Sequence, residues 1–194
     1  MVSNHHKLDI LINNAGVLKV STARASNGID ARFMINTIAS YLLTKRLLPL
    51  LDKTGRVINV TSAAQASVNL AALCGAGPQL ETMDAYSQSK LALIMWSRHL
   101  ANSSTADTPT VIAVNPGSKL ATKMVQEGFG VEGRDIGIGA KIIVNLALED
   151  QYASASGQYF HNDLGRFIEP HPDALIDEQC KQVVACIEKV CKGS

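Results

Sequence analysis

Two residues four positions apart, Tyr86 and Lys90, have the side chains and the spacing for proton transfer. On a helix, residues at this spacing lie on one face, one turn from each other. A phenol with an ordinary pKa near ~10 is a poor proton donor at neutral pH unless a nearby cation stabilises its phenolate. The ammonium of Lys90 is placed to be that cation. On its own, however, the pair fits an exposed tyrosine beside a lysine at least as well.

Further short segments surround this pair in a fixed order. They are Asn13-Asn14-Ala15-Gly16 after an apolar run, Asn36 within a helical pattern, Thr61-Ser62 after a β-branched run, and Asn115-Pro116-Gly117 after another. With these segments the chain, from about Leu8 to Arg166, resembles the short-chain dehydrogenase/reductase family. The stretch between Ser62 and Tyr86 is similar to the branch that contains retinol-dehydrogenase-like proteins and related carbonyl reductases.

The resemblance implies an NAD(P)-dependent oxidoreductase that transfers a hydride between a nicotinamide and a small carbonyl or alcohol substrate. Such a transfer places negative charge on the substrate oxygen, so hydrogen-bond donors are needed there. Tyr86 would supply the proton, and Ser62 would hold the same oxygen. Lys90 would lower the Tyr86 pKa and bind the nicotinamide ribose, while Asn36 would anchor a water molecule that links Lys90 to solvent. The alternatives are a solvent-facing asparagine at position 36 and a backbone-capping hydroxyl at position 62.

The resemblance also implies cofactor contacts. These fall on Asn14, Ala15, Gly16, Tyr86, Lys90, Pro116, Gly117 and Thr122. The residues at 14–16 are small enough for the backbone to approach the adenosine half, the Pro-Gly pair would shape the floor below the nicotinamide, and the threonine would contact its carboxamide. Each could equally be ordinary turn chemistry. The sequence does not distinguish NADP from NAD.

One departure from the family concerns the start of the chain. Family members begin with a strand, a Gly-rich turn and a helix N-terminus that together hold the cofactor pyrophosphate. The expected Gly-x-x-x-Gly-x-Gly run is absent near the start, and the run at 8–13 would be the fourth strand of the family sheet. We therefore expect an α/β fold, a Rossmann-like doubly wound parallel sheet that is N-terminally truncated, with the first three strands missing. At ~30 residues or more per βαβ unit, roughly 80 residues would be missing.

Three hypotheses for function remain open. The chain is either an NAD(P)-dependent carbonyl reductase or alcohol dehydrogenase, or a truncated, non-catalytic remnant that serves as a binding or oligomerisation module. The four residues Asn36, Ser62, Tyr86 and Lys90 favour the enzyme, whereas the missing Gly-rich turn favours impaired chemistry. In a third, weaker hypothesis, the exposed edge of the strand at 8–13 pairs with another chain.

Composition fits one domain that spans residues 1–194. Hydrophobic residues make up 46% of the sequence, enough for a sizeable core, and the formal net charge of +1 gives no electrostatic reason to bind nucleic acid or a charged membrane. No run approaches the ~18 apolar residues of a membrane span and no signal-peptide segment is evident, so we expect a cytoplasmic protein without a membrane partner. The cysteines have neither Cys-x-x-Cys spacing nor a nearby His pair, which predicts reduced thiols and no metal site.

Alternating patterns predict strands at residues 8–13, 56–61, 110–115 and 157–160. Helices are expected at residues 28–48, 85–101, 136–148 and 172–192, with Asp84 as the N-cap of the second. The helix at 85–101 is apolar almost all round, which indicates burial on more than its sheet-facing side. In the family this helix and the preceding one form a subunit interface, so the resemblance implies a homodimer or homotetramer; burial under the chain's own loops is the alternative. The segment 120–134 resembles the family's substrate lid.

Overall fold

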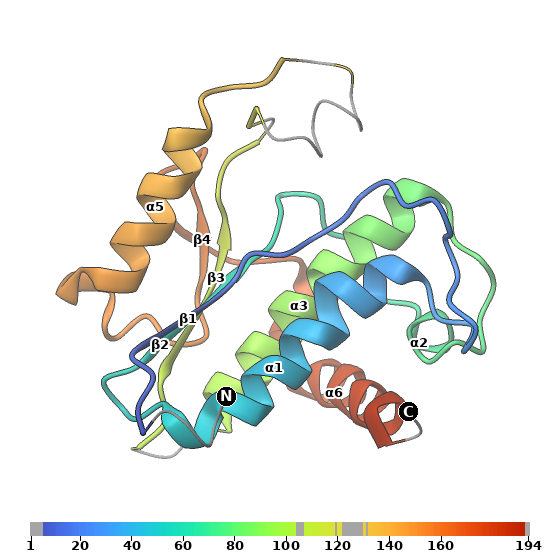
Figure 1. Ribbon diagram of the computed structural model, residues 1–194, viewed down its shortest axis with the longest axis horizontal. Helices are drawn as coiled ribbons and strands as arrows, with labels where there is room; N and C mark the ends of the chain where they lie inside the picture. Colours follow the sequence, from blue (N-terminus) through green and yellow to red (C-terminus); the bar gives the residue numbers. More distant parts are fainter. Residues whose placement is uncertain (1–5, 104–106, 119, 122–129, 131, 193–194) are drawn as a thin grey trace.

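A computed structural model describes residues 6–103, 107–118, 120–121, 130 and 132–192. In these residues a five-stranded sheet, in the order β1-β2-β3-β4-β5, lies between two helical layers (Figure 1). Strands β1 to β4 are parallel, and β5 pairs antiparallel with β4. The strands are β1 (Ile10–Asn13), β2 (Arg56–Val60), β3 (Thr110–Asn115), β4 (Tyr159–His161) and β5 (Arg166–Ile168). The predicted α/β Rossmann-like sheet is confirmed, and the antiparallel edge strand β5 was not predicted.

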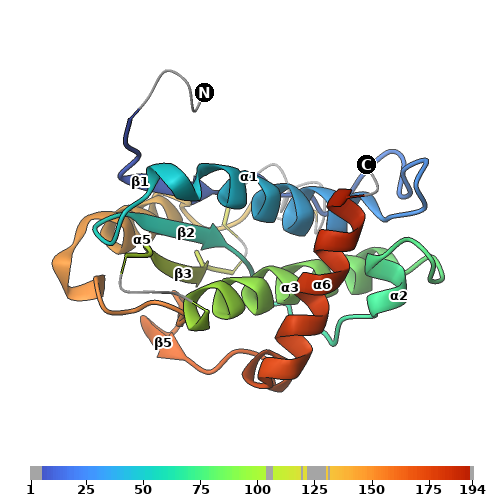
Figure 2. The same cartoon turned by 90° about the horizontal axis from the view of Figure 1, so that it is seen from below.

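Four helices lie on one side of the sheet and a single helix, α5, covers the other side in the part of the chain that is described (Figures 1 and 2). The first layer contains α1 (Ser40–Leu47), α2 (Leu70–Leu73), α3 (Thr82–Asn102) and α6 (Asp177–Lys192), and the second is α5 (Ile136–Leu148). Shorter helical turns are the π-helical turn Phe33–Ala39 and the 3-10 turns Leu48–Leu50, Asp150–Tyr152 and Pro172–Leu175.

Residue parity along the strands decides which layer each side chain joins. Successive side chains of a strand point to opposite faces of its sheet. Val57 and Val111 therefore pack toward Leu47 on the α1 side, whereas Ile58 and Ile112 pack against α5. Every residue of β2 and β3 is buried, as expected for central parallel strands with helices on both faces.

Three predicted helix starts differ from the structure. The helix expected at 172–192 starts as the 3-10 turn Pro172–Leu175, and α6 follows from Asp177. Helix α3 begins at Thr82 with Glu81 as its N-cap, so Asp84 lies inside the first turn instead of capping it. An acidic side chain is favoured there as well, because it faces the positive end of the helix dipole. The helix expected from residue 28 begins with the π-helical turn Phe33–Ala39 and continues as α1.

The outer face of α3 is covered by the chain itself. Leu91, Ile94 and Trp96 are fully buried, and Val183 and Ile187 of α6 belong to the same core cluster. Figure 2 shows α6 lying across α3. α6 covers this part of α3, as the alternative of burial by the chain itself expects, and the oligomeric state stays a prediction.

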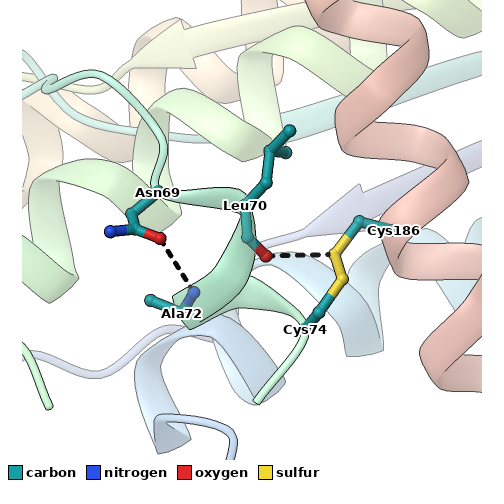
Figure 3. Close-up of a disulfide and its surroundings, with 5 residues drawn as sticks. All are labelled: Asn69, Leu70, Ala72, Cys74 and Cys186. Atoms are coloured by element: carbon teal, nitrogen blue, oxygen red, sulfur yellow. Dashed lines mark hydrogen bonds between the residues drawn. A yellow bond between two sulfur atoms is a disulfide. The ribbon is translucent and has the colours of Figure 1, made fainter. Parts of the chain in front are cut away.

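The prediction of reduced thiols is wrong for two of the cysteines. Cys74, just after α2, and Cys186 in α6 form a disulfide with an S–S distance of 2.05 Å (Figure 3). Asn69 caps α2 by accepting from the backbone N–H of Ala72 at 3.0 Å, and the Cys186 sulfur lies 3.6 Å from the carbonyl oxygen of Leu70. The two cysteines are 112 positions apart, so their spacing carried no signal. Cys180 and Cys191 are free.

None of the described helices combines the length and the apolar character that crossing a membrane requires. Strand β1 pairs with β2 on one side and forms an edge of the sheet among the described strands.

Candidate active site

The carboxyl ends of β1, β2 and β3 border one cavity of about 930 Å³. Ligands of parallel α/β sheets bind at this edge. The segments that follow these strands bring together most of the predicted site. The predicted residues that line the cavity are Asn14, Ala15, Gly16, Ser62, Tyr86, Lys90, Pro116 and Gly117.

Ser62 and Tyr86 meet at the wall of this cavity. Ser62 follows the end of β2, and Tyr86 lies in the second turn of α3 with only 9% of its surface exposed. The side chains of Ser62 and Tyr86 form a hydrogen bond, which lowers the pKa of the Tyr86 phenol. The Ser62 hydroxyl oxygen also accepts from the backbone N–H of Ala64 at 3.1 Å, so the backbone-capping alternative describes a second role of the same group.

Lys90 lies one helical turn beyond Tyr86 and is almost fully buried. Its ammonium nitrogen is 5.8 Å from the centre of the Tyr86 ring and donates to the Val60 carbonyl oxygen at 2.9 Å. Burial lowers the Lys90 pKa to about 8. A group with this pKa is still mostly protonated at neutral pH, so the lysine carries a positive charge next to the phenol.

The predicted direction of the Tyr86 pKa is not observed in this structure. Burial raises the Tyr86 pKa above its ordinary value, and the hydrogen bond with Ser62 offsets only part of that increase. Desolvation disfavours the charged form of a phenol, and burial is the larger of the two effects on Tyr86. In the structure described here, the phenol is a protonated acid.

A second pair with the same spacing shows why the motif alone was ambiguous. Tyr41 and Lys45 of α1 are also four residues apart, with the Lys45 nitrogen 6.0 Å from the Tyr41 ring centre. Lys45 is exposed, and the Tyr41 hydroxyl donates to Glu188 of α6 at 2.8 Å, outside the cavity. Burial at the carboxyl edge of the sheet, and not spacing, distinguishes the candidate site.

Asn36 is buried in the π-helical turn that precedes α1, with 1% of its surface exposed. Its amide nitrogen donates to the Val17 carbonyl at 3.0 Å and to the Ser89 hydroxyl at 2.9 Å, and its side-chain oxygen accepts from the Val17 N–H at 2.8 Å. The solvent-facing alternative is therefore wrong. Through Ser89, whose hydroxyl donates to the Tyr86 carbonyl at 2.7 Å, Asn36 ties the loop after β1 to the helix turn that carries the phenol. π-Helical turns often occur at functional sites for such reasons of placement.

The cofactor residues predicted at 14–16, 116 and 117 lie along the cavity. Gly117 has a φ of 133°, in the region that favours glycine, so a side chain at this position would strain the wall. Thr122 and most of the predicted lid lie outside the described residues.

The spacing Gly-x-x-x-Gly-x-Gly does occur once away from the start, at Gly133, Gly137 and Gly139. This segment leads into α5 and does not follow a strand. Asp135 caps the helix by accepting from the backbone N–H of Gly137 at 2.9 Å. A carboxylate at that helix end would repel a pyrophosphate, so this run is not suited to hold the pyrophosphate of a cofactor.

Sequence reasoning missed the apolar side of the cavity. Leu18, Met83, Ile136 and Ile143 line it, and none has a side chain that marks it as functional. Tyr159 of β4 was also missed; its hydroxyl donates to the Ser62 carbonyl oxygen at 3.0 Å and fixes the end of β2.

Comparison with known proteins gives the family. The sequence matches the family model of the short chain dehydrogenases over residues 1–130. That match covers more than half of the chain, so the protein belongs to the short-chain dehydrogenase family of oxidoreductases, and the predicted resemblance is confirmed.

Curated relatives include retinol and polyprenol dehydrogenases. Human retinol dehydrogenase 13 is 27% identical over 205 residues, which cover 95% of this chain and 61% of the relative. Mouse retinol dehydrogenase 12 is 30% identical over 171 residues, 82% of this chain and 54% of the relative. Human polyprenol dehydrogenase is 36% identical over 120 residues, 57% of this chain and 36% of the relative. The chain thus spans 61% or less of the length of these relatives.

Solved structures agree on the fold. An uncharacterised protein from Mycobacterium paratuberculosis superimposes with a TM-score of 0.75 at 25% identity, covering 98% of this chain and 69% of that chain. A landomycin C-6 ketoreductase with bound NADP and rabelomycin gives a TM-score of 0.52 at 26% identity, covering 80% and 60% of the two chains.

Proposed function

We propose that this chain is the catalytic part of an NAD(P)-dependent oxidoreductase that interconverts a carbonyl compound and an alcohol. The observation that carries the proposal is the meeting of Ser62, Tyr86 and Lys90 on one wall of a cavity at the carboxyl edge of the sheet. Tyr86 is the proton donor, Ser62 holds the substrate oxygen, and Lys90 is the neighbouring cation.

The roles of these residues follow from the negative charge that develops on the substrate oxygen. As a carbonyl is reduced, its oxygen becomes negative, and the Ser62 hydroxyl and the Tyr86 phenol both donate to it. Tyr86, whose pKa burial raises, starts this step as a protonated acid. The phenolate left after proton transfer lies near the Lys90 ammonium, 5.8 Å from the ring centre, which stabilises it. Asn36 keeps the Tyr86 helix turn in place through Ser89; a water held by Asn36 that refills the proton from solvent stays a prediction.

The cavity fits the nicotinamide half of a dinucleotide. Among the described residues, the buried Lys90 ammonium makes one hydrogen bond, to Val60, and so retains donors for ribose hydroxyls. The small residues at 14–16 and the Pro116-Gly117 wall leave room for flat rings against the backbone. The bound cofactor would supply or accept the hydride. The choice between NADP and NAD stays open.

The substrate is proposed to be apolar. Leu18, Met83, Ile136 and Ile143 give the cavity an apolar side, which favours a substrate with a hydrocarbon body and one reactive oxygen. The names of the relatives, retinol and polyprenol dehydrogenases, describe substrates of this kind and support the proposal.

A second candidate is the non-catalytic binding module. It is favoured by the single Gly-x-x-x-Gly-x-Gly run, whose helix end is capped by Asp135 and therefore unsuited to a pyrophosphate. The cytoplasmic location and the oligomeric state also stay predictions, and coverage of α3 by α6 now favours a monomer over a dimer built on that helix.

Titration of the 194-residue chain with NADPH and NADH, followed by nicotinamide fluorescence, tests the proposal. We expect saturable binding that weakens at least tenfold in the Lys90→Met variant. The matched control is Lys45→Met, which removes the lysine of the equivalent pair outside the cavity and should bind like the wild type. A folded chain that binds neither nucleotide would favour the non-catalytic module.

A further inference from the structure

Asp163 lies in the turn between β4 and β5, and its carboxylate accepts hydrogen bonds from two separate segments, residues 115–118 and Arg134. Oδ2 accepts from Asn115 Nδ2 at 3.0 Å and from the Ser118 hydroxyl at 2.7 Å. The backbone N–H of Ser118 lies 3.0 Å from both carboxylate oxygens. Nη1 of Arg134 donates to Oδ1 at 3.0 Å, and Nδ1 of His161 lies 3.9 Å from Oδ2.

The first of these segments, residues 115–118, belongs to the cavity wall. Asn115, Gly117 and Ser118 line the cavity, whereas Asp163 does not and lies behind them. The Asn115 side-chain oxygen accepts from the Gly117 N–H at 3.3 Å, so the amide that donates to Asp163 also shapes the turn at this positive-φ glycine. The carboxylate therefore sets the position of this wall from outside.

The second segment leads to the start of α5. The Arg134 carbonyl accepts from the Ala121 N–H at 2.7 Å, and Arg134 is followed directly by the Asp135 cap of α5. Ile136 and Gly139, in the first turns of that helix, line the cavity, and Gly139 lies beside Pro116 of the wall formed after β3. One carboxylate thus connects this wall with the start of α5.

We propose that Asp163 is a positioning residue that holds the Asn115–Ser118 wall and the start of α5 at a fixed separation, so that the cavity is shaped for the nicotinamide half of the cofactor. The part of this proposal that concerns the cofactor rests on the function proposed above. Asp163 touches no reacting atom in this arrangement. It acts through Ser118 and Arg134.

A charged carboxylate suits this task better than any neutral side chain. Its two oxygens accept four hydrogen bonds here, one of them from a guanidinium, and hydrogen bonds to a charged acceptor are stronger than neutral ones. Although partial burial on its own would raise the Asp163 pKa, the bonds from Ser118 and Asn115 lower it, so the carboxylate is ionised at neutral pH.

Amide hydrogen exchange of the Asp163→Asn variant, followed residue by residue by NMR, tests the positioning role without any enzyme assay. Asparagine keeps the size and one acceptor oxygen but removes the charge and the second acceptor. We expect the amides of Gly117, Ser118 and Ala121 to exchange at least tenfold faster, with the amides of β2 unchanged. Asp52→Asn is the matched control, because Asp52 accepts from the Thr54 N–H and hydroxyl at 2.8 and 2.6 Å and pairs with Lys7, away from the cavity.

Unchanged exchange at these three amides would overturn the proposal. An equal increase in β2 would overturn it as well, because Asp163 would then only stabilise the whole fold. A nucleotide titration gives the second readout: NADPH binding should weaken at least fivefold in Asp163→Asn and stay unchanged in Asp52→Asn. If the wild-type chain binds no nucleotide, the proposed function fails, and the exchange pattern alone still decides the positioning role.

Discussion

The Lys90 ammonium lies 5.8 Å from the centre of the Tyr86 ring, and both side chains are buried. Tyr41 and Lys45 repeat the spacing and nearly repeat the distance, at 6.0 Å, yet Lys45 is exposed. The two pairs therefore have similar geometry but different burial within one protein. In the proposed mechanism the buried pair is reactive because it borders the cavity and has Ser62 as a third partner.

Replacing Ser62 by alanine should slow carbonyl reduction by about 10²- to 10³-fold, because one donor to the developing negative charge is lost. The measurement is kcat with an apolar aldehyde and NADPH. Ser156→Ala is the control, since the Ser156 hydroxyl oxygen also accepts from a backbone N–H, that of Val111 at 3.1 Å, but outside the cavity. A Ser62→Ala rate within twofold of the wild type would remove Ser62 from the mechanism.

Lys90 should destabilise the fold at neutral pH. The Lys90 pKa is about 8 in the folded chain, whereas the ordinary value of 10.5 applies to the unfolded chain. Below pH 8 the lysine is therefore protonated in both the folded and the unfolded chain, and the full cost of burying its charge is present. Between pH 8 and 10.5 the unfolded chain binds more protons, and stability rises with pH. Lys90→Met should therefore gain about 3 kcal/mol relative to the wild type below pH 8, partly offset by the lost bond to Val60.

Urea denaturation of both proteins across this pH range measures the effect. The difference between variant and wild type isolates Lys90, because the other titrating groups are common to both. The gain should shrink as the pH approaches 10.5. A difference that does not change with pH would contradict the assigned Lys90 pKa.

Asn36→Ala should lower the free energy of unfolding by about 3 kcal/mol, because it leaves the partly buried N–H and carbonyl of Val17 and the buried Ser89 hydroxyl without this partner. Asn102→Ala, which removes an exposed bond to Asp177, should cost about 0.5 kcal/mol or less. Chemical denaturation compares the two. Equal, small losses would mean that Asn36 does not hold the loop after β1 to α3.

Reducing the Cys74–Cys186 disulfide should lower stability by about 2–5 kcal/mol, since it closes a long loop in the unfolded chain. Denaturation with and without a reductant, beside Cys74→Ser and a Cys191→Ser control, measures the loss. Mass spectrometry of thiol-blocked protein from cells tests the same bond in its native compartment. Full alkylation of Cys74 there would show a reduced pair, as expected for cytosolic proteins.

The strands were predictable because each is a short apolar or β-branched run that ends in a polar turn. Strands β2 and β3 and helix α5 fall within one residue of their predicted ranges. Strand β5 was missed, since Arg166–Ile168 is three residues long and carries no pattern of its own. The disulfide and the coverage of α3 by α6 were missed because both join segments far apart in the sequence.

The candidate site was predictable only in part, and for a similar reason. Reactive or turn-forming residues, such as Tyr86, Ser62 and Gly117, can be recognised in the sequence from their type and their order. Asp163 cannot, because its importance comes from two segments far apart in the sequence, residues 115–118 and Arg134, that both donate to it. The direction of the Tyr86 pKa was also beyond the sequence, since burial decides it.

The central claim is that Tyr86 delivers the proton, and turnover of the Tyr86→Phe variant tests it most directly. The assay follows NADPH oxidation by the 194-residue chain with an apolar aldehyde, beside Tyr41→Phe as the matched control. The account predicts that Tyr86→Phe binds NADPH like the wild type but reduces the aldehyde at least 10²-fold more slowly, with Tyr41→Phe unaffected. Equal rates in the two variants, or no turnover by a folded wild-type chain, would contradict it.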